Sequence, residues 1–399
     1  MNRLTCILLL ALLIGLGFFA ACAGDDDDND DANPTDDDAS ADDDTAPDDD
    51  TSADDDTSDD DAELTWQWVP IDGVICRDGS DSGIAMRLAS ASSELMVFLE
   101  GGGACYDEES CADNPSHFDE TDLAEIVDNE LVTGIFDTTN SDNPVRDWNM
   151  VYVPYCTGDI YAGSQPDGTV PGVEAKQQFV GFSNTLKIAE WVGENFADST
   201  RVLLAGTSAG GFGTITAYAP LADRFPGVPV AMIDDSGPFV DSNAALAPCY
   251  QLLLRLLWNA NEAIPAGCAE CNGFLGDGIS NILPYLAETY PLGRFGLFST
   301  MEDATICDFW GMGQDGCTGE DPLPGDIFSA ALIDERDNFL IPTGKWSTFF
   351  IEGEMHGILP YDETTSDEVS FYGTEIESTL FTAWLSNLIS GDEPLNVGP

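Results

Sequence analysis

A serine between two glycines is the residue on which the chemistry of this sequence centres. Residues 206–210 read Gly-Thr-Ser-Ala-Gly, a G-x-S-x-G pattern with Ser208 in the middle. The apolar run Val202–Ala205 precedes it, as a buried strand would, and small and apolar residues follow it through Tyr218, as in a helix. A strand that ends in this tight turn and opens a helix exposes the serine hydroxyl. It also directs the helix N-terminus at the reaction centre.

A serine hydroxyl is a weak nucleophile and needs a base within hydrogen-bond reach. The sequence contains two histidines, His117 and His356. His356 follows a late predicted strand and precedes the last predicted helix, where the α/β-hydrolase order Ser…Asp…His places the base. His117 lies upstream of the serine in a cysteine-containing loop. We therefore expect His356 to be the base.

The acid that orients the imidazole should come from a strand-end loop between Ser208 and His356. Asp303 fits best, because it follows a short predicted strand and precedes a predicted helix. Asp234 and Asp235 are its rivals, since they end the strand that follows the nucleophile. Most aspartates of so acidic a chain are solvated surface groups, so the choice among them is not decided by residue type. Asp303 is the preferred acid, and Asp234 and Asp235 remain alternatives.

Acyl transfer also requires donors for the oxyanion that forms in the transition state. The backbone amide of Ala209, directly after the nucleophile, is one expected donor. The others should come from Gly102, Gly103 or Ala104, in the glycine loop after the predicted buried strand Glu94–Glu100. Successive glycines at a strand end indicate a backbone that must approach another group closely. A flexible loop is the alternative.

Alternating strands and helices must position these groups. Strands are expected over 64–71, 94–100, 148–154, 202–205, 228–233, 296–299 and 347–351, and helices over 173–196, 327–339 and 376–389. This alternation predicts an α/β fold, with a mostly parallel central sheet and helices on both faces. Sites in such sheets lie beyond the carboxyl ends of the strands. The cysteine-rich, helical residues 243–292 are expected to be an insertion over the sheet, either a lid or a packed cap.

The first 63 residues predict export rather than a folded domain. Residues 1–21 contain one arginine, an apolar run and a small-residue end, which is typical of a signal peptide. Cys22 follows, as the lipidated cysteine of a bacterial lipoprotein does, and ordinary secretion is the alternative. Residues 22–63 are then an anchor cysteine and a disordered Asp-rich linker. Residues 64–399 are expected to form one enzyme domain.

Charge and cysteine content exclude some classes of function. The formal net charge is −62, and the Asp-rich segment accounts for only part of it. Nucleic acid is therefore excluded as a partner, and a polyanionic substrate is disfavoured. Eleven cysteines are present, and without Cys6 and Cys22 an odd number remains. We expect mostly structural disulfides and at least one unpaired cysteine. The CxxC at Cys268 and Cys271 has no second CxxC or nearby histidine, so we predict no metal site.

Three motifs together resemble the pectin acetylesterase and Notum family. They are LEGGGAC at 99–105, PYCTGD at 154–159 and GTSAGG at 206–211. The resemblance covers most of residues 66–390 and implies an α/β-hydrolase-like fold. It also implies a Ser-Asp-His triad and an oxyanion hole from the glycine loop. Plant and animal members have Trp where this chain has Ala104, so the mouth of the pocket differs.

The resemblance implies an exported serine carboxylester hydrolase. Family members deacylate sugars or a lipidated protein, so the expected substrate is an acylated small molecule or polysaccharide. Ser208, Asp303 and His356 take the triad roles, and no cofactor is required. We expect a monomer attached to a bacterial membrane through its N-terminal lipid. A non-catalytic ligand-binding protein on the same fold and an acyltransferase are the alternatives.

Overall fold

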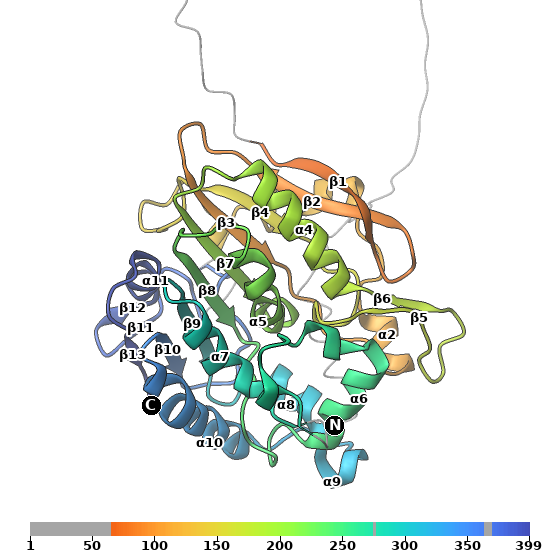
Figure 1. Ribbon diagram of the computed structural model, residues 1–399. Coiled ribbons are helices and arrows are strands. Elements are labelled where there is room, and N and C mark those ends of the chain that lie inside the picture. Colours follow the sequence, from red (N-terminus) through yellow and green to blue (C-terminus); the bar gives the residue numbers. More distant parts are fainter. Residues whose placement is uncertain (1–64, 274–276, 363–368) are drawn as a thin grey trace, which may run out of the picture. The chain divides into compact units, whose positions relative to one another are not determined.

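The computed structural model describes residues 65–273, 277–362 and 369–399 (Figure 1). These residues belong to one compact unit that ends at Pro399. The predicted signal peptide over 1–21, the lipidation at Cys22 and the linker through residue 63 lie outside the described residues. Within the described ranges, no helix has both the length and the apolar character needed to cross a bilayer.

A nine-stranded sheet forms the centre of the described unit. Its strands, in spatial order, are β1 (Gln67–Ile75), β2 (Asp81–Arg87), β4 (Asn149–Val153), β3 (Glu94–Leu99), β7 (Arg201–Thr207), β8 (Val230–Asp235), β9 (Arg294–Thr300), β10 (Trp346–Ile351) and β13 (Asn396–Val397). The pairs β1–β2 and β2–β4 are antiparallel. The remaining pairs are parallel. The predicted mostly parallel sheet is confirmed.

Helices cover both faces of this sheet (Figure 1). One face packs against α4 (Gly181–Asn195), α5 (Ala209–Ala222), α7 (Ile282–Thr289) and α10 (Gly325–Glu335), and the other against α3 (Glu120–Ile126) and α11 (Phe381–Ser390). Strand β7 is continuously apolar because both of its faces are buried. Its residues Val202 and Leu204 join the core on one face, whereas Leu203 and Ala205 join the core on the other.

Shorter elements complete the unit around the sheet. The helices are α2 (Glu108–Asp113), α6 (Pro248–Trp258), α8 (Ala304–Gly311) and α9 (Gln314–Cys317), and the strands are β5 (Gln165–Gly168), β6 (Gln177–Phe179), β11 (Glu375–Ile376) and β12 (Thr379–Leu380). The predicted insertion over 243–292 contains α6, three 3-10 turns and α7. It is therefore helical, as expected.

Two predicted helices are shorter than their sequence indicated. The last was expected over 376–389, yet α11 starts at Phe381, because the first residues of that range belong to the short antiparallel pair β11–β12. The other was expected over 173–196, yet α4 starts at Gly181, because β5 and β6 form an antiparallel hairpin just before it. Residues 177–179 alternate between buried and half-buried. Over three residues, an alternation of period two cannot be told from one turn of a helix. The residues of the β5–β6 hairpin could therefore not be distinguished from the start of the adjoining helix.

Disulfides fasten the loops that surround the sheet edge. The bonded pairs are Cys76–Cys156, Cys105–Cys111, Cys249–Cys317 and Cys268–Cys271. Cys307 is buried and unpaired. The prediction of structural disulfides with an odd cysteine left over is therefore confirmed. The Cys105–Cys111 bond closes the chain directly after the glycine loop, and the Cys249–Cys317 bond joins α6 to α9.

Candidate active site

Ser208 lies between strand β7 and helix α5, in the strand–turn–helix context predicted from its motif. Its backbone angles are φ 59° and ψ −120°, a strained conformation for a residue with a side chain. The flanking glycines are required by close packing. A Cβ at Gly206 would lie 2.3 Å from the carbonyl oxygen of Gly210, and one at Gly210 would lie 2.0 Å from that of Leu99. The turn thus holds Ser208 at the carboxyl end of β7.

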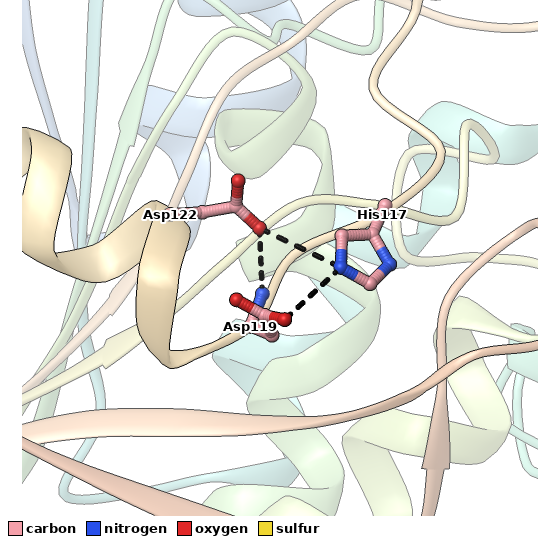
Figure 2. Close-up of side chains that lie close together, drawn as sticks. All are labelled: His117, Asp119 and Asp122. Atoms are coloured by element: carbon pink, nitrogen blue, oxygen red, sulfur yellow. Dashed lines mark hydrogen bonds and ion pairs between the residues drawn. The ribbon is translucent and has the colours of Figure 1, made fainter.

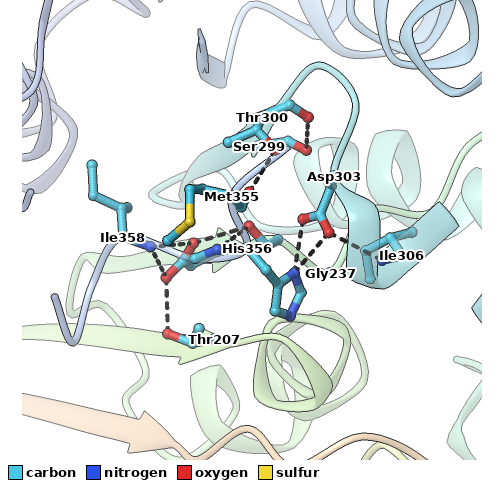
Figure 3. A network of polar contacts seen from close by, with 12 residues as sticks. Thr207, Gly237, Ser299, Thr300, Asp303, Ile306, Met355, His356 and Ile358 are labelled. Carbon is cyan, nitrogen blue, oxygen red and sulfur yellow. Dashed lines mark hydrogen bonds and ion pairs between the residues drawn. The ribbon is translucent and has the colours of Figure 1, made fainter. Parts of the chain in front are cut away.

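His356 and Asp303 form a hydrogen-bonded pair at the same edge of the sheet (Figure 3). The Nδ1 atom of His356 lies 2.7 Å from Oδ2 and 3.0 Å from Oδ1 of Asp303. Asp303 follows β9 and caps α8, accepting a hydrogen bond from the Ile306 amide at 3.0 Å. Because β9 and β10 are neighbours, residues 53 positions apart in sequence meet at the ends of adjacent strands.

The surroundings of His356 set its charge and leave one ring nitrogen available. Burial lowers the pKa of His356, but the charge and hydrogen bond of Asp303, together with the charge of Asp235, outweigh it, so the pKa is raised. With Nδ1 facing a carboxylate, the proton is held there and Nε2 is the acceptor. That Nε2 atom is buried and has no hydrogen-bond partner among the described residues. A ring nitrogen in this state can accept a proton, as a general base does.

The loop that carries His356 packs against the end of the nucleophile strand. A Cβ at Gly357 would lie 3.0 Å from the Cγ2 atom of Thr207. A side chain at position 357 would therefore crowd Thr207, so the residues directly next to His356 and Ser208 lie close together although their strands are not adjacent in the sheet.

The two rival acids are buried but bind backbone groups. Asp234 accepts a hydrogen bond from the Gly237 amide at 2.8 Å. Asp235 accepts hydrogen bonds from the amides of Ile358 and Leu359. Of these candidate acids, Asp303 is the one whose carboxylate is hydrogen-bonded to the imidazole of His356 in the described structure.

Most of the predicted oxyanion donors meet at one cavity. Gly103, Ala104, Ser208 and Ala209 all line it. Ala209 is the first residue of α5, so its amide is one of the unsatisfied donors at that helix N-terminus. Gly102 precedes this group by one residue and is not part of the cavity lining. The geometry brings Ser208 together with residues of the glycine loop and of the N-terminus of α5.

The glycine loop is fixed rather than slack. Gly102 and Gly103 have φ angles of 147° and 77°, which residues with side chains rarely adopt. Asn114 donates a hydrogen bond to the Gly102 carbonyl, and the Tyr155 hydroxyl donates one to the Gly103 carbonyl at 2.9 Å. Holding both carbonyls also fixes the peptide planes and hence the direction of the amides. The interpretation of close approach, and not that of a flexible loop, agrees with this arrangement.

Sequence analysis did not single out Glu100, the half-buried acid that directly follows strand β3 and precedes this loop. The side chain of Glu100 accepts a hydrogen bond from the Tyr155 amide at 2.7 Å, and its backbone carbonyl accepts one from the Tyr161 hydroxyl at 3.0 Å. Burial raises the pKa of Glu100 to about 7. A signal was present, because Glu100 and Tyr155 belong to two of the quoted motifs. Their hydrogen bond joins the two motifs in the structure.

The cavity beside Ser208 is small and mainly apolar. Its volume is about 60 Å³. Helix α6 contributes Tyr250, Leu254 and Trp258, and helix α8 contributes Ile306, Phe309 and Trp310. The predicted insertion thus supplies one wall of the cavity. That wall is fastened, because the indole Nε1 of Trp258 donates a hydrogen bond to the Cys105 carbonyl at 3.0 Å.

His117 lies in a different setting, on the surface at the start of α3 (Figure 2). Its Nε2 atom is 3.3 Å from Asp119 and 3.8 Å from Asp122. The potential ligand atoms of the three residues all lie within 4.8 Å of one another. Asp119 and Asp122, however, already form the capping box of α3. Local helix capping therefore accounts for this cluster.

A family model described as pectinacetylesterase matches residues 59–269, more than half of the chain. The chain belongs to the pectinacetylesterase family. This match includes the glycine loop and the turn at Ser208 but ends before Asp303 and His356. Membership thus rests on the segment that contains the glycine loop and Ser208, whereas Asp303 and His356 lie outside the matched residues.

Similar proteins include carboxylesterases of animals. The chain is 32% identical over 186 residues to palmitoleoyl-protein carboxylesterase notum1 of Xenopus laevis, covering 42% of this chain and 36% of that protein. It is 29% identical over 186 residues to palmitoleoyl-protein carboxylesterase NOTUM of Homo sapiens, covering 42% and 35%. The chain therefore spans about a third of the length of these curated relatives.

A solved structure has the same fold. The Wnt deacylase Notum from Drosophila matches with a TM-score of 0.60 and 20% identity, over 83% of this chain and 96% of that one. At this identity the likeness establishes the fold. The predicted α/β-hydrolase-like architecture and the predicted family are both confirmed.

Proposed function

We propose that this protein is a serine carboxylester hydrolase. The observation that carries the proposal is the hydrogen bond between the half-buried His356 and the fully buried Asp303 at the sheet edge where Ser208 occupies its strained turn. A histidine that is oriented by a carboxylate and has a free Nε2 is the base that a serine nucleophile needs. The names of the similar animal proteins, which are carboxylesterases, support the same class of reaction.

The reaction proceeds in two steps through an acyl-enzyme. The Oγ atom of Ser208 bonds to the ester carbonyl carbon while Nε2 of His356 takes the hydroxyl proton. The amide of Ala209 and those of Gly103 and Ala104, which line the cavity, hold the oxyanion. When the ester C–O bond breaks, the departing alcohol takes the proton from His356. Water then attacks the acyl-enzyme with His356 again as the base, releasing the acid and restoring Ser208.

The cavity favours a short acyl group. A water molecule needs roughly 10–15 Å³ of such space, so about 60 Å³ accommodates only a few atoms beyond the carbonyl. Its apolar walls suit a hydrocarbon group. The net charge of −62 disfavours an anionic carrier. Acetyl or another short acyl group on a neutral saccharide is the substrate class that combines these features.

The site of action proposed here is the outside of a bacterial cell. Disulfides persist in oxidising compartments, and four are present in the described structure. Together with the signal-like residues 1–21 they support export, with a lipid on Cys22 and the linker through residue 63 as the attachment of a monomeric catalytic domain. Replacing Cys22 by Ser should move the protein from the membrane fraction to the soluble fraction, whereas an unchanged distribution would contradict the lipid anchor.

Active-site labelling and an ester series test the proposed function. A fluorophosphonate should label one residue, Ser208, and the label should be lost in Ser208→Ala. With p-nitrophenyl esters, kcat/KM should be highest for short acyl groups and fall for long ones. Absence of both labelling and turnover in folded protein would contradict the enzyme and favour a non-catalytic binding protein. Transfer of the acyl group to an added alcohol in preference to water would identify an acyltransferase.

A further inference from the structure

The histidine and the nucleophile come from strands that are not neighbours. Strand β7 carries Ser208 at its end and β10 is followed by His356, with β8 and β9 between them. Adjacent strands are about 4.8 Å apart, so the strand ends of β7 and β10 are separated by about 14 Å. The segment after β10 must therefore cross the ends of β9 and β8 to bring the imidazole to the serine.

Asp235, at the end of β8, lies on this crossing path and is fully buried. Its Oδ2 atom accepts hydrogen bonds from the Thr207 hydroxyl at 2.9 Å, the Ile358 amide at 3.0 Å and the Leu359 amide at 2.9 Å. In Figure 3, the dashed lines from Thr207 and Ile358 reach the same carboxylate. The backbone carbonyl of Asp235 also accepts a hydrogen bond from the Ser208 amide at 2.7 Å.

One residue therefore binds both halves of the site. We propose that Asp235 is a positioning residue that fastens the His356 loop across the sheet edge to the turn that holds Ser208. This inference rests on the proposed serine hydrolase function. The neighbouring Ser236 acts in the same direction, because its hydroxyl accepts a hydrogen bond from the Gly357 amide at 3.0 Å.

The charge of Asp235 gives this role a signature that simple scaffolding lacks. Burial raises the pKa of Asp235, whereas the hydrogen bonds from Ile358, Leu359 and Thr207 and the nearby His356 act in the opposite direction. Asp234 and Tyr361 interact electrostatically with Asp235, and Tyr361 also interacts with Asp303. Asp303 and Asp235 both favour the protonated form of His356.

The test compares Asp235→Asn with Asp234→Asn in the full-length protein, using the pH profile of kcat/KM for p-nitrophenyl acetate. In the wild-type protein, Thr207, Ile358 and Leu359 donate to the carboxylate of residue 235. The NH₂ group of an asparagine cannot accept these hydrogen bonds, so the His356 loop is held less firmly. A misplaced base typically reduces the rate on the order of 10- to 100-fold, mainly through kcat. Loss of the charge also lowers the pKa of His356, so the acid limb of the profile moves to lower pH.

Asp234 is the matched control. It is buried in the same strand and binds the Gly237 amide rather than the His356 loop, so its variant should leave the acid limb in place. Asp235→Asn with kcat within about twofold of wild type, or with reduced activity and an unmoved acid limb, would overturn the inference. Wild-type protein without turnover would instead overturn the proposed function, and the inference with it.

A second variant serves if Asp235→Asn does not fold. Thr207→Val removes one hydrogen bond to the carboxylate, keeps the side-chain shape and leaves the charge of Asp235 intact. The expected loss in kcat is about fivefold, which corresponds to one lost hydrogen bond, with the acid limb unmoved. Unchanged kcat in folded Thr207→Val would overturn the proposal.

Discussion

The two histidines of this protein are each surrounded by aspartates, yet their settings differ. His117 lies 3.3 Å from Asp119 on the surface, with 44% of its side chain exposed. His356 lies 2.7 Å from Asp303, with 18% of its side chain and none of the Asp303 side chain exposed. The first pair is separated by two positions in sequence and the second by 53.

Proximity to a carboxylate therefore affects an imidazole differently at the surface and at the sheet edge. At the surface, water and salt screen the attraction between charges, and such pairs contribute little. At the sheet edge, water is largely excluded, so Asp303 both orients the ring and raises the pKa of His356 against the effect of burial. Long-range packing supplies that exclusion, whereas a helix cap at the surface cannot.

Removal of the half-buried His356 should reduce activity most. His356→Ala should lower kcat for p-nitrophenyl acetate by on the order of 10⁶-fold, the loss found when a serine hydrolase loses its base. Labelling of Ser208 by a fluorophosphonate should slow in parallel, with folding checked by circular dichroism. Retained turnover in the folded variant would remove His356 from the mechanism and reopen the comparison with His117.

Loss of the acid should have the next largest effect. Asp303→Ala should lower kcat by on the order of 10⁴-fold, because the imidazole loses both its orientation and the stabilisation of its charged form. Asp235→Ala, measured in the same assay, should be less damaging. The reverse ranking would assign the acid to Asp235 and make Asp303 a helix cap alone.

The pH profile tests whether burial has changed the chemistry of His356. The base must be neutral to accept the serine proton, and its pKa is raised. Activity should therefore fall as pH decreases through a value above about 6.5, the ordinary histidine pKa. Asp303→Asn removes the charge that contributes most to raising the pKa of His356. The residual activity of this variant should therefore persist to lower pH. An acid limb that is the same in both proteins would show that another group controls it.

The smallest effect is expected at the exposed histidine. His117→Ala should change kcat/KM by less than about twofold and the free energy of unfolding by less than about 0.5 kcal/mol, as surface substitutions usually do. Kinetics and thermal unfolding of the purified variant measure both. A large loss of activity would place His117 in the mechanism and erase the contrast between the two settings.

Much of the architecture could be predicted because its signals are local. The strand, tight turn and helix around Ser208 follow one another in sequence, so their residue types indicate the structure directly. The β5–β6 hairpin could not be predicted in this way, since its short alternation merges with the adjoining helix. Disulfide partners were also unpredictable, because bonds such as Cys76–Cys156 depend on distances that packing sets.

The reactive residues could be identified from the sequence alone: a serine in a G-x-S-x-G turn, two histidines, a glycine loop and an odd number of cysteines once Cys6 and Cys22 are set aside. The tertiary structure decided which aspartate meets His356. Strand order in a parallel sheet differs from chain order, and the placement of β9 beside β10 brings Asp303 to the imidazole. The same sheet order places β8 between the strand of Ser208 and the strands of Asp303 and His356. Asp235, at the end of β8, therefore meets the loop that follows β10 and binds its amides.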